Sequence, residues 1–213
     1  NSCSSSPIVN ELHIAEINQD RLEEVKKEVH PTYSTVDYKE LISNKNLDTI
    51  IISATPETTH YPMAKESLES GKHVFLEKPL ALTLDEADEL IEISSKNKLK
   101  FAIGYSQRFN PKFAYIKKCI DENKIGRPVS ALVSRHITRG LGKKISSRVK
   151  LSPAAMEATH DLDFVLWCME PAKPVRVYSQ SAFGAMQEVT GSADSQWILI
   201  TMDNGVVLSI GAG

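Results

Sequence analysis

The first half of the chain alternates between short apolar runs and longer segments with helical periodicity. The apolar runs predict strands at residues 12–17, 50–52, 74–76 and 101–104. The run Ile50-Ile51-Ile52 is β-branched throughout, which is typical of a strand that is buried on both faces. Strands that are separated by helices of this length predict right-handed βαβ crossovers and a parallel sheet.

Capping residues mark the helix boundaries in this half. Asp20 and Glu23 are three residues apart, as are Thr83 and Glu86, and each pair resembles a capping box at a helix start. Gly71 follows the helical segment before residues 74–76 and is predicted to cap its end.

The pattern changes after Arg108. Asn110-Pro111 predicts a helix start, because proline is tolerated at the first helical position. Asp203-Asn204-Gly205 lies between two apolar runs and predicts a β-hairpin with a type I′ turn. Another helix is predicted at 153–169, and strands are predicted at 129–137, 175–178 and 197–201.

The predicted fold class is therefore α/β, with a Rossmann-type parallel-sheet domain followed by an α+β domain with a largely antiparallel open sheet. The first domain is predicted to span residues 1–108 and the second 109–213. The first strand and the Gly-x-Gly-x-x-Gly loop of a Rossmann fold are missing from the sequence, so the phosphate cradle is absent. We expect the first domain to be incomplete at its N-terminus and the second at its C-terminus.

Composition narrows the class of protein. Among 213 residues, 41% are hydrophobic and 24% charged, which is ordinary for a soluble globular protein. The net charge of −2 and the pI near 6.3 argue against nucleic acid as the main partner. No apolar stretch approaches the length of a membrane span, so no membrane partner is predicted.

The cysteines bear on the compartment. Cys3, Cys119 and Cys168 are odd in number, far apart and without metal-ligand spacing. Reduced thiols are the simplest interpretation, and no metal site is predicted. The first six residues lack the basic and apolar regions of a signal peptide, so we predict a cytoplasmic protein.

The tripeptide Glu77-Lys78-Pro79 lies where the apolar run 74–76 ends and shortly before the next helix. In an open α/β sheet, ligands bind beyond the carboxyl ends of the strands. A lysine beside an acid at that position is a candidate proton donor or carbonyl polariser. A plain turn is the alternative interpretation, since Lys-Pro often follows a strand for that reason alone.

The predicted helix 153–169 has two different faces. Met156, His160, Asp163 and Trp167 share one side at spacings of four, three and four. An imidazole one turn from a carboxylate is a plausible acid/base, with the acid orienting the ring. The alternative is a half-buried histidine that makes a structural polar contact.

A longer series of residues connects these features. It runs from Ile51 through Thr55-Pro56 and His60 to Glu77-Lys78-Pro79-Leu80-Ala81. Later landmarks follow in order: Gly104-Tyr105, Arg108-Phe109, Pro111, Ile125-Gly126 and Thr159-His160-Asp161-Leu162-Asp163. Together they resemble the signature of the glucose–fructose oxidoreductase / inositol dehydrogenase (Gfo/Idh/MocA) family, and the resemblance covers roughly residues 11–213.

The resemblance implies an NAD(P)-dependent dehydrogenase that acts on CH–OH groups of a sugar, polyol, sugar acid or related hydroxy compound. It implies that Lys78 lies beside the nicotinamide and the substrate, in a corner shaped by Glu77 and Pro79, with a cis Lys78–Pro79 bond. It also implies that His160 is the general base, with Asp163 nearby.

The resemblance implies further cofactor contacts. Thr55, Pro56 and His60 would lie along the adenosine and pyrophosphate side, and Arg108 would border the cofactor cleft. Asn18 stands where NAD enzymes place an acid for the ribose 2′-hydroxyl, and Glu16 lies too early on the strand. Asparagine tolerates a 2′-phosphate better than a carboxylate does, so the cofactor is predicted to be NAD or NADP.

One position departs from the family pattern. The family often has an aspartate four residues before the histidine, and this chain has Met156 there. Glu157 is the next residue and lies about 100° round the helix. Either His160 depends on Asp163, or Lys78 is the main acid/base.

Basic residues gather in the stretch 135–150. It contains six of them and no acid: Arg135, Arg139, Lys143, Lys144, Arg148 and Lys150. In the family this stretch runs near the substrate cleft, which makes an anionic substrate such as a sugar acid one interpretation. A solvated loop is the other, and Gly140 and Gly142 indicate a mobile segment.

Two functions remain open from the sequence. The first is a dehydrogenase, and the second is a sensor or regulator that holds NAD(P) without turnover. Met156 in place of an acid favours the second. The open sheet of the second domain is predicted to form a homodimer or homotetramer, as in the family.

Overall fold

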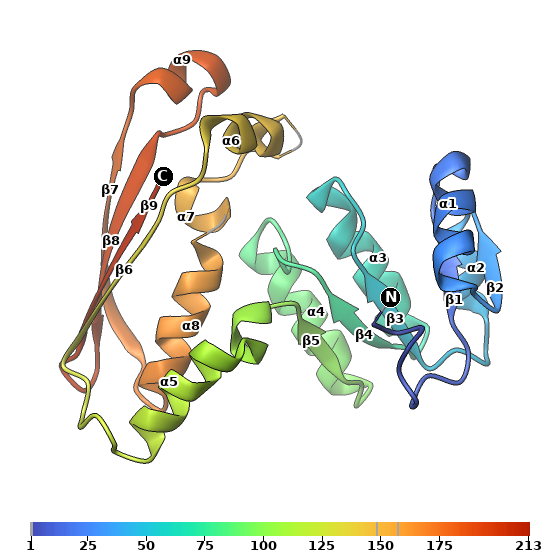
Figure 1. Ribbon diagram of the computed structural model, residues 1–213, viewed down its shortest axis with the longest axis horizontal. Coiled ribbons are helices and arrows are strands. Elements are labelled where there is room, and N and C mark those ends of the chain that lie inside the picture. The colour runs from blue at the N-terminus through green and yellow to red at the C-terminus, as the bar shows by residue number, and fades with distance from the viewer. Residues whose placement is uncertain (1, 148, 157) are drawn as a thin grey trace. The chain divides into compact units, whose positions relative to one another are not determined.

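The computed structural model describes residues 2–147, 149–156 and 158–213 (Figure 1). Glu157 and Arg148, which the sequence analysis considered, lie outside the described residues. The chain divides into two compact units, Asn1–Ile103 and Gly104–Gly213. The first unit thus ends where its last strand ends, five residues before the predicted boundary at 108. The roles assigned to the two predicted domains stay predictions.

Strands and helices alternate in the first unit. Its strands are β1 (His13–Ala15), β2 (Tyr33–Thr35), β3 (Thr49–Ile52), β4 (His73–Leu76) and β5 (Phe101–Ile103). Its helices are α1 (Gln19–Val29), α2 (Tyr38–Ser43), the 3-10 helix η1 (Glu57–Thr59), α3 (His60–Glu69) and α4 (Leu84–Lys96). The sequence analysis missed β2 and α2, because the three residues of β2 include no aliphatic run.

All strand pairs in this unit are parallel, which confirms the Rossmann-type prediction. β1 pairs with β2, and β3, β4 and β5 form a second group in that order. Among the described residues, no ladder joins the two groups. In the doubly wound order, the strand that carries the glycine loop lies in the middle of the sheet.

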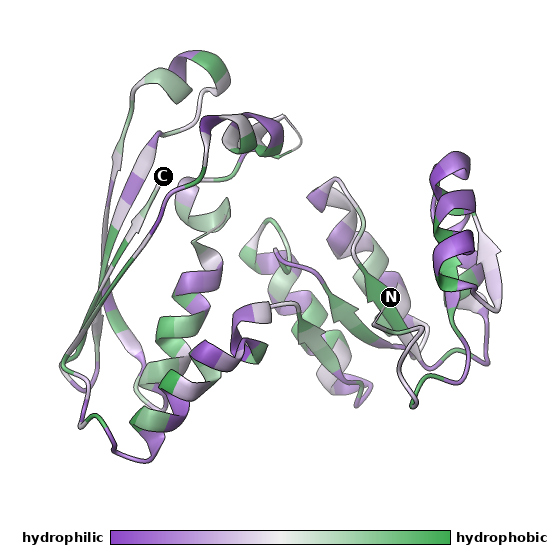
Figure 2. Ribbon diagram, viewed as in Figure 1, coloured by the Kyte–Doolittle hydropathy of each residue, from purple (hydrophilic) through white to green (hydrophobic). Residues whose placement is uncertain are grey.

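The core of this unit lies on one face of β3 and β4. Ile52, Val74 and Leu76 are almost fully buried there, against Leu68 of α3 and Leu90 of α4. Figure 2 shows the hydrophobic colour on β3 and β4 and the hydrophilic colour on much of α1. Burial of residues 50–52 on both faces is not seen in the described residues, because both helices cover the same face.

The opposite face of β3 is open within the described residues. The side chain of Ile51 points to that face, and the residue is 55% exposed. Phe75 of β4 is also exposed there.

Helix ends in this unit follow the capping rules, with one correction. Thr83 and Glu86 form a complete capping box at the start of α4, as predicted. Gly71, with φ of +78°, follows α3, as predicted. The predicted Asp20–Glu23 box is wrong, because α1 begins earlier and the side chain of Asn18 caps it.

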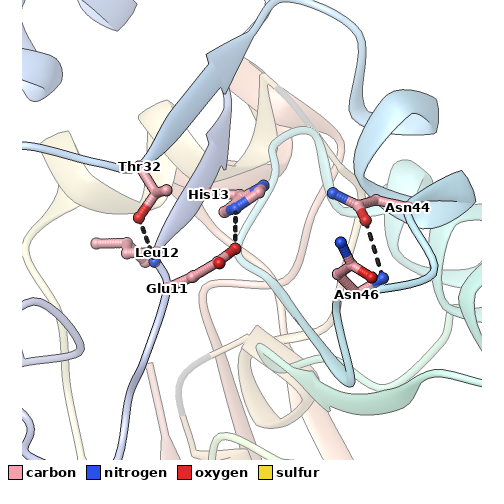
Figure 3. A network of polar contacts seen from close by, with 6 residues as sticks. All are labelled: Glu11, Leu12, His13, Thr32, Asn44 and Asn46. Atoms are coloured by element: carbon pink, nitrogen blue, oxygen red, sulfur yellow. Dashed lines mark hydrogen bonds and ion pairs between the residues drawn. The ribbon is translucent and has the colours of Figure 1, made fainter.

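Polar contacts hold the amino-terminal end of β1 (Figure 3). The side chains of His13 and Glu11 are joined through Nε2 and Oε2 at 2.9 Å. The backbone N–H of Leu12 donates to the hydroxyl of Thr32 just before β2, at 3.3 Å. These contacts lie at the amino-terminal edge, away from the carboxyl ends of the strands.

The second unit contains a mixed four-stranded sheet and several helices. Its strands are β6 (Ser130–Arg135), β7 (Pro174–Ala182), β8 (Ser195–Met202) and β9 (Val207–Ala212). Its helices are η2 (Ser106–Phe109), α5 (Pro111–Asp121), α6 (Arg139–Ser146), α7 (Pro153–Met156), α8 (Thr159–Met169) and α9 (Ala185–Thr190). The strand order is β6-β9-β8-β7, and only the β6–β9 pair is parallel, so the predicted largely antiparallel sheet is confirmed.

One prediction about the helices of this unit is wrong. The predicted helix 153–169 is divided into α7 and α8. Ala154 of α7 and Ala158 are both buried in the sheet-facing core. The stretch around Gly140 and Gly142, for which a solvated loop was one interpretation, is the helix α6, which the Thr138 side chain caps.

Gly142 lies where α6 meets α9. A Cβ on Gly142 would lie 3.4 Å from the Met186 side chain of α9, which is an ordinary van der Waals distance. The structure therefore gives no packing reason for a glycine at this position.

The hairpin at residues 203–205 is confirmed, but its predicted type I′ turn is wrong. Only Gly205 has a positive φ, of +84°, and Asn204 does not. The Asn204 side chain accepts a hydrogen bond from the backbone N–H of Val206 at 3.1 Å. A tight turn of this kind with glycine in the left-handed region is the common three-residue alternative.

Helix α8 covers one face of the sheet and leaves the other open. Val165 and Met169 of α8 pack on Ile198 and Ile200 of β8. On the opposite face, Trp197 lies across from Gly211, and a Cβ on Gly211 would come within 2.7 Å of the indole ring. The larger apolar residues of this open face are Leu132, Tyr178, Trp197, Leu199 and Val207.

Candidate functional site

The first group of predicted site residues lies at the carboxyl ends of β3 and β4. Ile52 and Leu76 are register partners, so the loops that follow them start side by side. The backbone N–H of Glu77 donates to the carbonyl oxygen of Ile52 at 2.9 Å, which extends the pairing by one residue. Thr55–Pro56 and Lys78–Pro79 are both cis, and the second confirms the expectation from the resemblance.

His60, the first residue of α3, ties these two loops together. The residue is only 2% exposed. Its Nδ1 lies 2.8 Å from the carbonyl oxygen of Pro79, and its Nε2 lies 3.0 Å from that of Ala54. The ring therefore fixes the loops that carry Thr55 and Lys78, and any effect on a cofactor passes through them.

Lys78 lies half-buried between an exposed acid and a proline. Its backbone N–H donates to the Glu77 carboxylate at 3.1 Å, so that carboxylate is turned toward the lysine backbone. Thr55 and Pro56 are exposed on the neighbouring loop. These residues form one polar group at the sheet edge where open α/β folds bind ligands.

Asn18 lies after β1, and its side chain caps the helix α1. Its side-chain oxygen accepts a hydrogen bond from the backbone N–H of Arg21 at 3.0 Å. The Glu16 carboxylate accepts from the backbone N–H of Asn18 at 3.0 Å and pairs with Arg21 at 3.3 Å. The sequence analysis placed Glu16 too early on the strand, yet its carboxylate folds forward to this turn.

The second group of predicted site residues lies on α8. His160 is half-buried in the first turn of that helix. The ring of Tyr105 meets the His160 ring edge-on, with centroids 6.0 Å apart and an interplanar angle of 90°. The hydroxyl of Tyr105 lies 3.2 Å from that of Thr159, and either one could donate.

Asp163 forms a bidentate ion pair with Arg108. Its oxygens accept from Nε of Arg108 at 2.8 Å and from Nη2 at 2.6 Å. The guanidinium also lies 5.5 Å from the ring centroid of Trp167. Hydrogen bonding to Asp163 raises the pKa of Arg108, so the guanidinium stays charged.

These bonds give Arg108 and Asp163 a partner that the sequence did not predict. Arg108 was expected to border the cofactor cleft, and its guanidinium is engaged within the second unit. Asp163 was expected near His160, and it lies one turn further along α8 with both oxygens on Arg108. Contacts of either residue with a cofactor or substrate stay predictions.

A second bidentate pair on α8 was missed by the sequence analysis. Asp161, which is 7% exposed, accepts from Nε and Nη2 of Arg135 at the end of β6. Arg135 was counted among six basic residues with no acid nearby in the sequence. Its partner lies 26 residues away, which no local pattern reveals.

A cavity of about 280 Å³ opens at the carboxyl ends of β6 and β9. Met156 is one of its walls and is 7% exposed, in a small apolar cluster with Ile145 and Val149. The hydroxyl of Ser146 is buried here and has no hydrogen-bond partner among the described residues. The other lining residues are Arg135, His136, Ile137, Thr138, Arg139, Gly142, Pro153, Met186, Ser192, Ala193, Asp194 and Gly213.

The described residues form neither a metal-ligand cluster nor a membrane-spanning helix. In the part of the chain that the structure describes, no three His, Cys, Asp or Glu side chains are grouped as ligands for a metal ion. No helix among the described residues is long and apolar enough to span a membrane. A shallower hollow of about 490 Å³ at residues 26 and 30–34 lies at the amino-terminal edge of β2, away from the predicted site residues.

The fold and the first residue group define a class: a Rossmann-type nucleotide-binding unit followed by an α+β unit. Residues 6–105 match the model of a family described as "Oxidoreductase family, NAD-binding Rossmann fold" (GFO_IDH_MocA). This match confirms the resemblance to the Gfo/Idh/MocA family that was drawn from the sequence, and its description names NAD as the cofactor that the family binds.

Relatives and solved structures agree with this placement. An uncharacterized oxidoreductase of Bacillus subtilis, YrbE, is 28% identical over 92% of this chain and 58% of its own length. The inositol 2-dehydrogenase of Salmonella typhimurium is 31% identical over 80% of this chain and 49% of its own length. The chain thus spans about half the length of the curated relatives that it matches.

One solved structure shows the fold. It is a scyllo-inositol dehydrogenase from Lactobacillus casei with bound cofactor NAD(H) and scyllo-inositol. The match has a TM-score of 0.85 and 19% identity, and it covers 100% of this chain and 64% of that one. At this identity the likeness concerns the fold, and it confirms the two-part α/β and α+β architecture.

Proposed function

We propose that the protein to which this chain belongs is a dehydrogenase that transfers hydride between NAD(P) and a CH–OH group of a polyol or sugar. The observation that carries the proposal is the arrangement around His60. One buried ring holds the Thr55-Pro56 loop and the Glu77-Lys78-Pro79 loop together at the ligand-binding edge of a parallel sheet. The family match and the names of the relatives support it.

The residues present fit a nicotinamide cofactor in part. Exposed Thr55 and Pro56 and the Glu77-Lys78-Pro79 turn are the groups that we assign to its binding. The sequence has no Gly-x-Gly-x-x-Gly turn, so we assign no residue to the pyrophosphate. Asn18 and Glu16 are the groups for a ribose hydroxyl. When bound, the nicotinamide accepts the hydride that leaves the substrate carbon.

Proton transfer is assigned to Lys78 and His160. Removing hydride from a CH–OH carbon leaves a hydroxyl proton that a base has to accept, and an amine or imidazole within hydrogen-bond reach does so. We assign a supporting role to Asp163. Its ion pair with Arg108 holds the turn of α8 that follows His160. Met156 supplies no ionisable group, so Lys78 takes the larger share of the proton chemistry.

Arg135 is paired with Asp161, so the basic stretch carries less unpaired charge into the cavity than its sequence indicates. We therefore favour a neutral polyol over a sugar acid.

An activity assay separates the enzyme from a non-catalytic sensor. The full-length protein is incubated with NAD or NADP and a panel of inositols, other polyols, sugars and sugar acids, and reduced nicotinamide is followed by absorbance. We expect turnover on a neutral polyol. Cofactor binding without turnover on the whole panel would establish the sensor and contradict the proposal.

The open sheet face supports self-association into a dimer or tetramer. It exposes Trp197, Leu199, Tyr178 and Leu132 on one face of the sheet, and contiguous exposed apolar residues mark interaction surfaces. Sedimentation of the full-length protein checks this, and a monomer at micromolar concentration would contradict it. A cytoplasmic location stays a prediction.

A further inference from the structure

The short helix η2 contacts α8 at two points. Tyr105, just before η2, reaches Thr159 and the ring of His160. Arg108, within η2, reaches Asp163 and Trp167. Both contacts lie within the second unit and join segments that are more than 50 residues apart in the sequence.

The spacing of the contacts makes them a matched pair. Tyr105 and Arg108 are three residues apart, which places them on one side of a 3-10 turn. Thr159, Asp163 and Trp167 are four residues apart in succession, which places them in one row along α8. The two residues of the η2 segment therefore meet the row of three on α8. The helix α8 can neither slide nor rotate against η2 without breaking both contacts.

The contact between Arg108 and Asp163 is rigid. The Asp163 side chain is 10% exposed and takes two hydrogen bonds from one planar guanidinium. Bidentate geometry fixes the angle between the two groups as well as their distance. The Trp167 ring beside the guanidinium limits its movement further.

His160 lies between the two contacts on α8. Thr159 precedes it by one residue and Asp163 follows it by three, so both neighbours are held. The edge of the Tyr105 ring limits rotation of the imidazole itself. Met156, at the position where an acid is often found, belongs to the separate helix α7 and packs among Ile145 and Val149.

We propose that Tyr105 and Arg108 are positioning residues that orient His160 for proton transfer, in place of an acid one turn before it. Tyr105 acts through the ring and Thr159, and Arg108 acts through Asp163. This inference rests on the proposed role of His160. Its core claim, an imidazole held in one orientation, is measurable without turnover.

The first test uses the imidazole signals of His160 in NMR spectra of the full-length protein. Tyr105→Phe keeps the ring and loses the hydroxyl, and Tyr105→Leu loses both. We expect the ring-current displacement of the His160 signals to survive in Tyr105→Phe and to disappear in Tyr105→Leu. Unchanged signals in Tyr105→Leu would overturn the proposal.

The second test uses kinetics of the full-length protein with an inositol. Arg108→Ala is expected to lower kcat by about tenfold or more while KM changes by less than about threefold, because misorientation acts on the chemical step. Arg108→Lys keeps the charge but not the fork, so we expect partial recovery. Lys65→Ala, which removes an ion pair with Glu89 in the first unit, is the control.

The outcomes separate this inference from the proposed function. Equal kcat in Arg108→Ala and the wild type would overturn it, as would a loss that appears only in KM. If Arg108→Ala does not fold, Arg108→Lys and the Tyr105 variants decide. Absence of turnover in the wild type would contradict the proposed function, and the NMR result would still decide whether the imidazole is held.

Discussion

The two groups of candidate site residues are fixed in different ways. In the first unit, one buried ring contacts two backbone carbonyls, and its partners are 6 and 19 residues away. In the second unit, ion pairs and ring contacts join residues that are 26, 54 and 55 apart. The first group is thus built by local loops on a sheet edge, and the second by side-chain partners from distant segments.

This difference explains what a single sequence can reveal. The loops after β3 and β4 carry a short recognisable run, because each backbone position there is set by its close neighbours. The orientation of His160 depends on Tyr105 and Arg108, whose contacts with α8 no spacing rule predicts. Charged residues that looked unpaired in the sequence, such as Arg135, have partners in the fold.

The largest stability effect is expected from His60→Ala in the first unit. The change leaves the carbonyls of Ala54 and Pro79 without their partner in a buried position, and we expect a loss of about 3 kcal/mol in the free energy of unfolding. His73→Ala is the matched control. That ring is only partly buried and accepts one hydrogen bond, from the backbone N–H of Lys100.

Chemical denaturation of the two variants measures the difference. A loss in His60→Ala no larger than in His73→Ala would show that the ring is not what holds the two loops. The claim that one buried ring fixes the candidate site residues of the first unit would then be wrong.

A smaller effect is expected from the pH dependence of the second unit. Burial between α8 and the sheet raises the pKa of the Cys168 thiol from 9.0 to about 11. The unfolded thiol ionises first as the pH rises, so this group lowers the stability progressively between about pH 9 and 11. Cys168→Ser should flatten that part of the stability curve.

Thiol labelling tests the burial of Cys168 independently. Cys3 is partly exposed and should react with a thiol reagent in the folded chain, whereas buried Cys168 should react only after unfolding. Equal rates at both cysteines at neutral pH would show that α8 does not stay closed on its sheet.

Much of the fold could be predicted from the sequence. The parallel first unit, the α4 capping box and the hairpin at 203–205 follow from local patterns and are confirmed. Burial of β3 on both faces is not seen in the described residues, and the predicted helix 153–169 is divided in two. The basic stretch 135–150, for which a solvated loop was one interpretation, contains the helix α6. In each case the packing of neighbouring elements, which a local pattern does not contain, decided the structure.

The candidate site residues likewise divide into those that a local sequence pattern predicts and those whose contacts only the fold reveals. The Glu77-Lys78-Pro79 turn was found from its place after a strand, and the structure adds only that His60 supports it. For α8 the sequence found His160 and Asp163 but not the arginine that holds Asp163. The buried pair of Asp161 and Arg135 had no signal in the sequence, because its two members lie on a helix and a strand.

The central claim is that Lys78, at the carboxyl end of β4, carries proton transfer in a hydride-transfer enzyme. Its most direct test is Lys78→Ala in the full-length protein, with kcat for an inositol and the dissociation constant of the nicotinamide cofactor measured side by side. We expect kcat to fall by about 10²-fold or more while the dissociation constant changes far less. An unchanged kcat would contradict the account, as would a loss that weaker cofactor binding explains by itself.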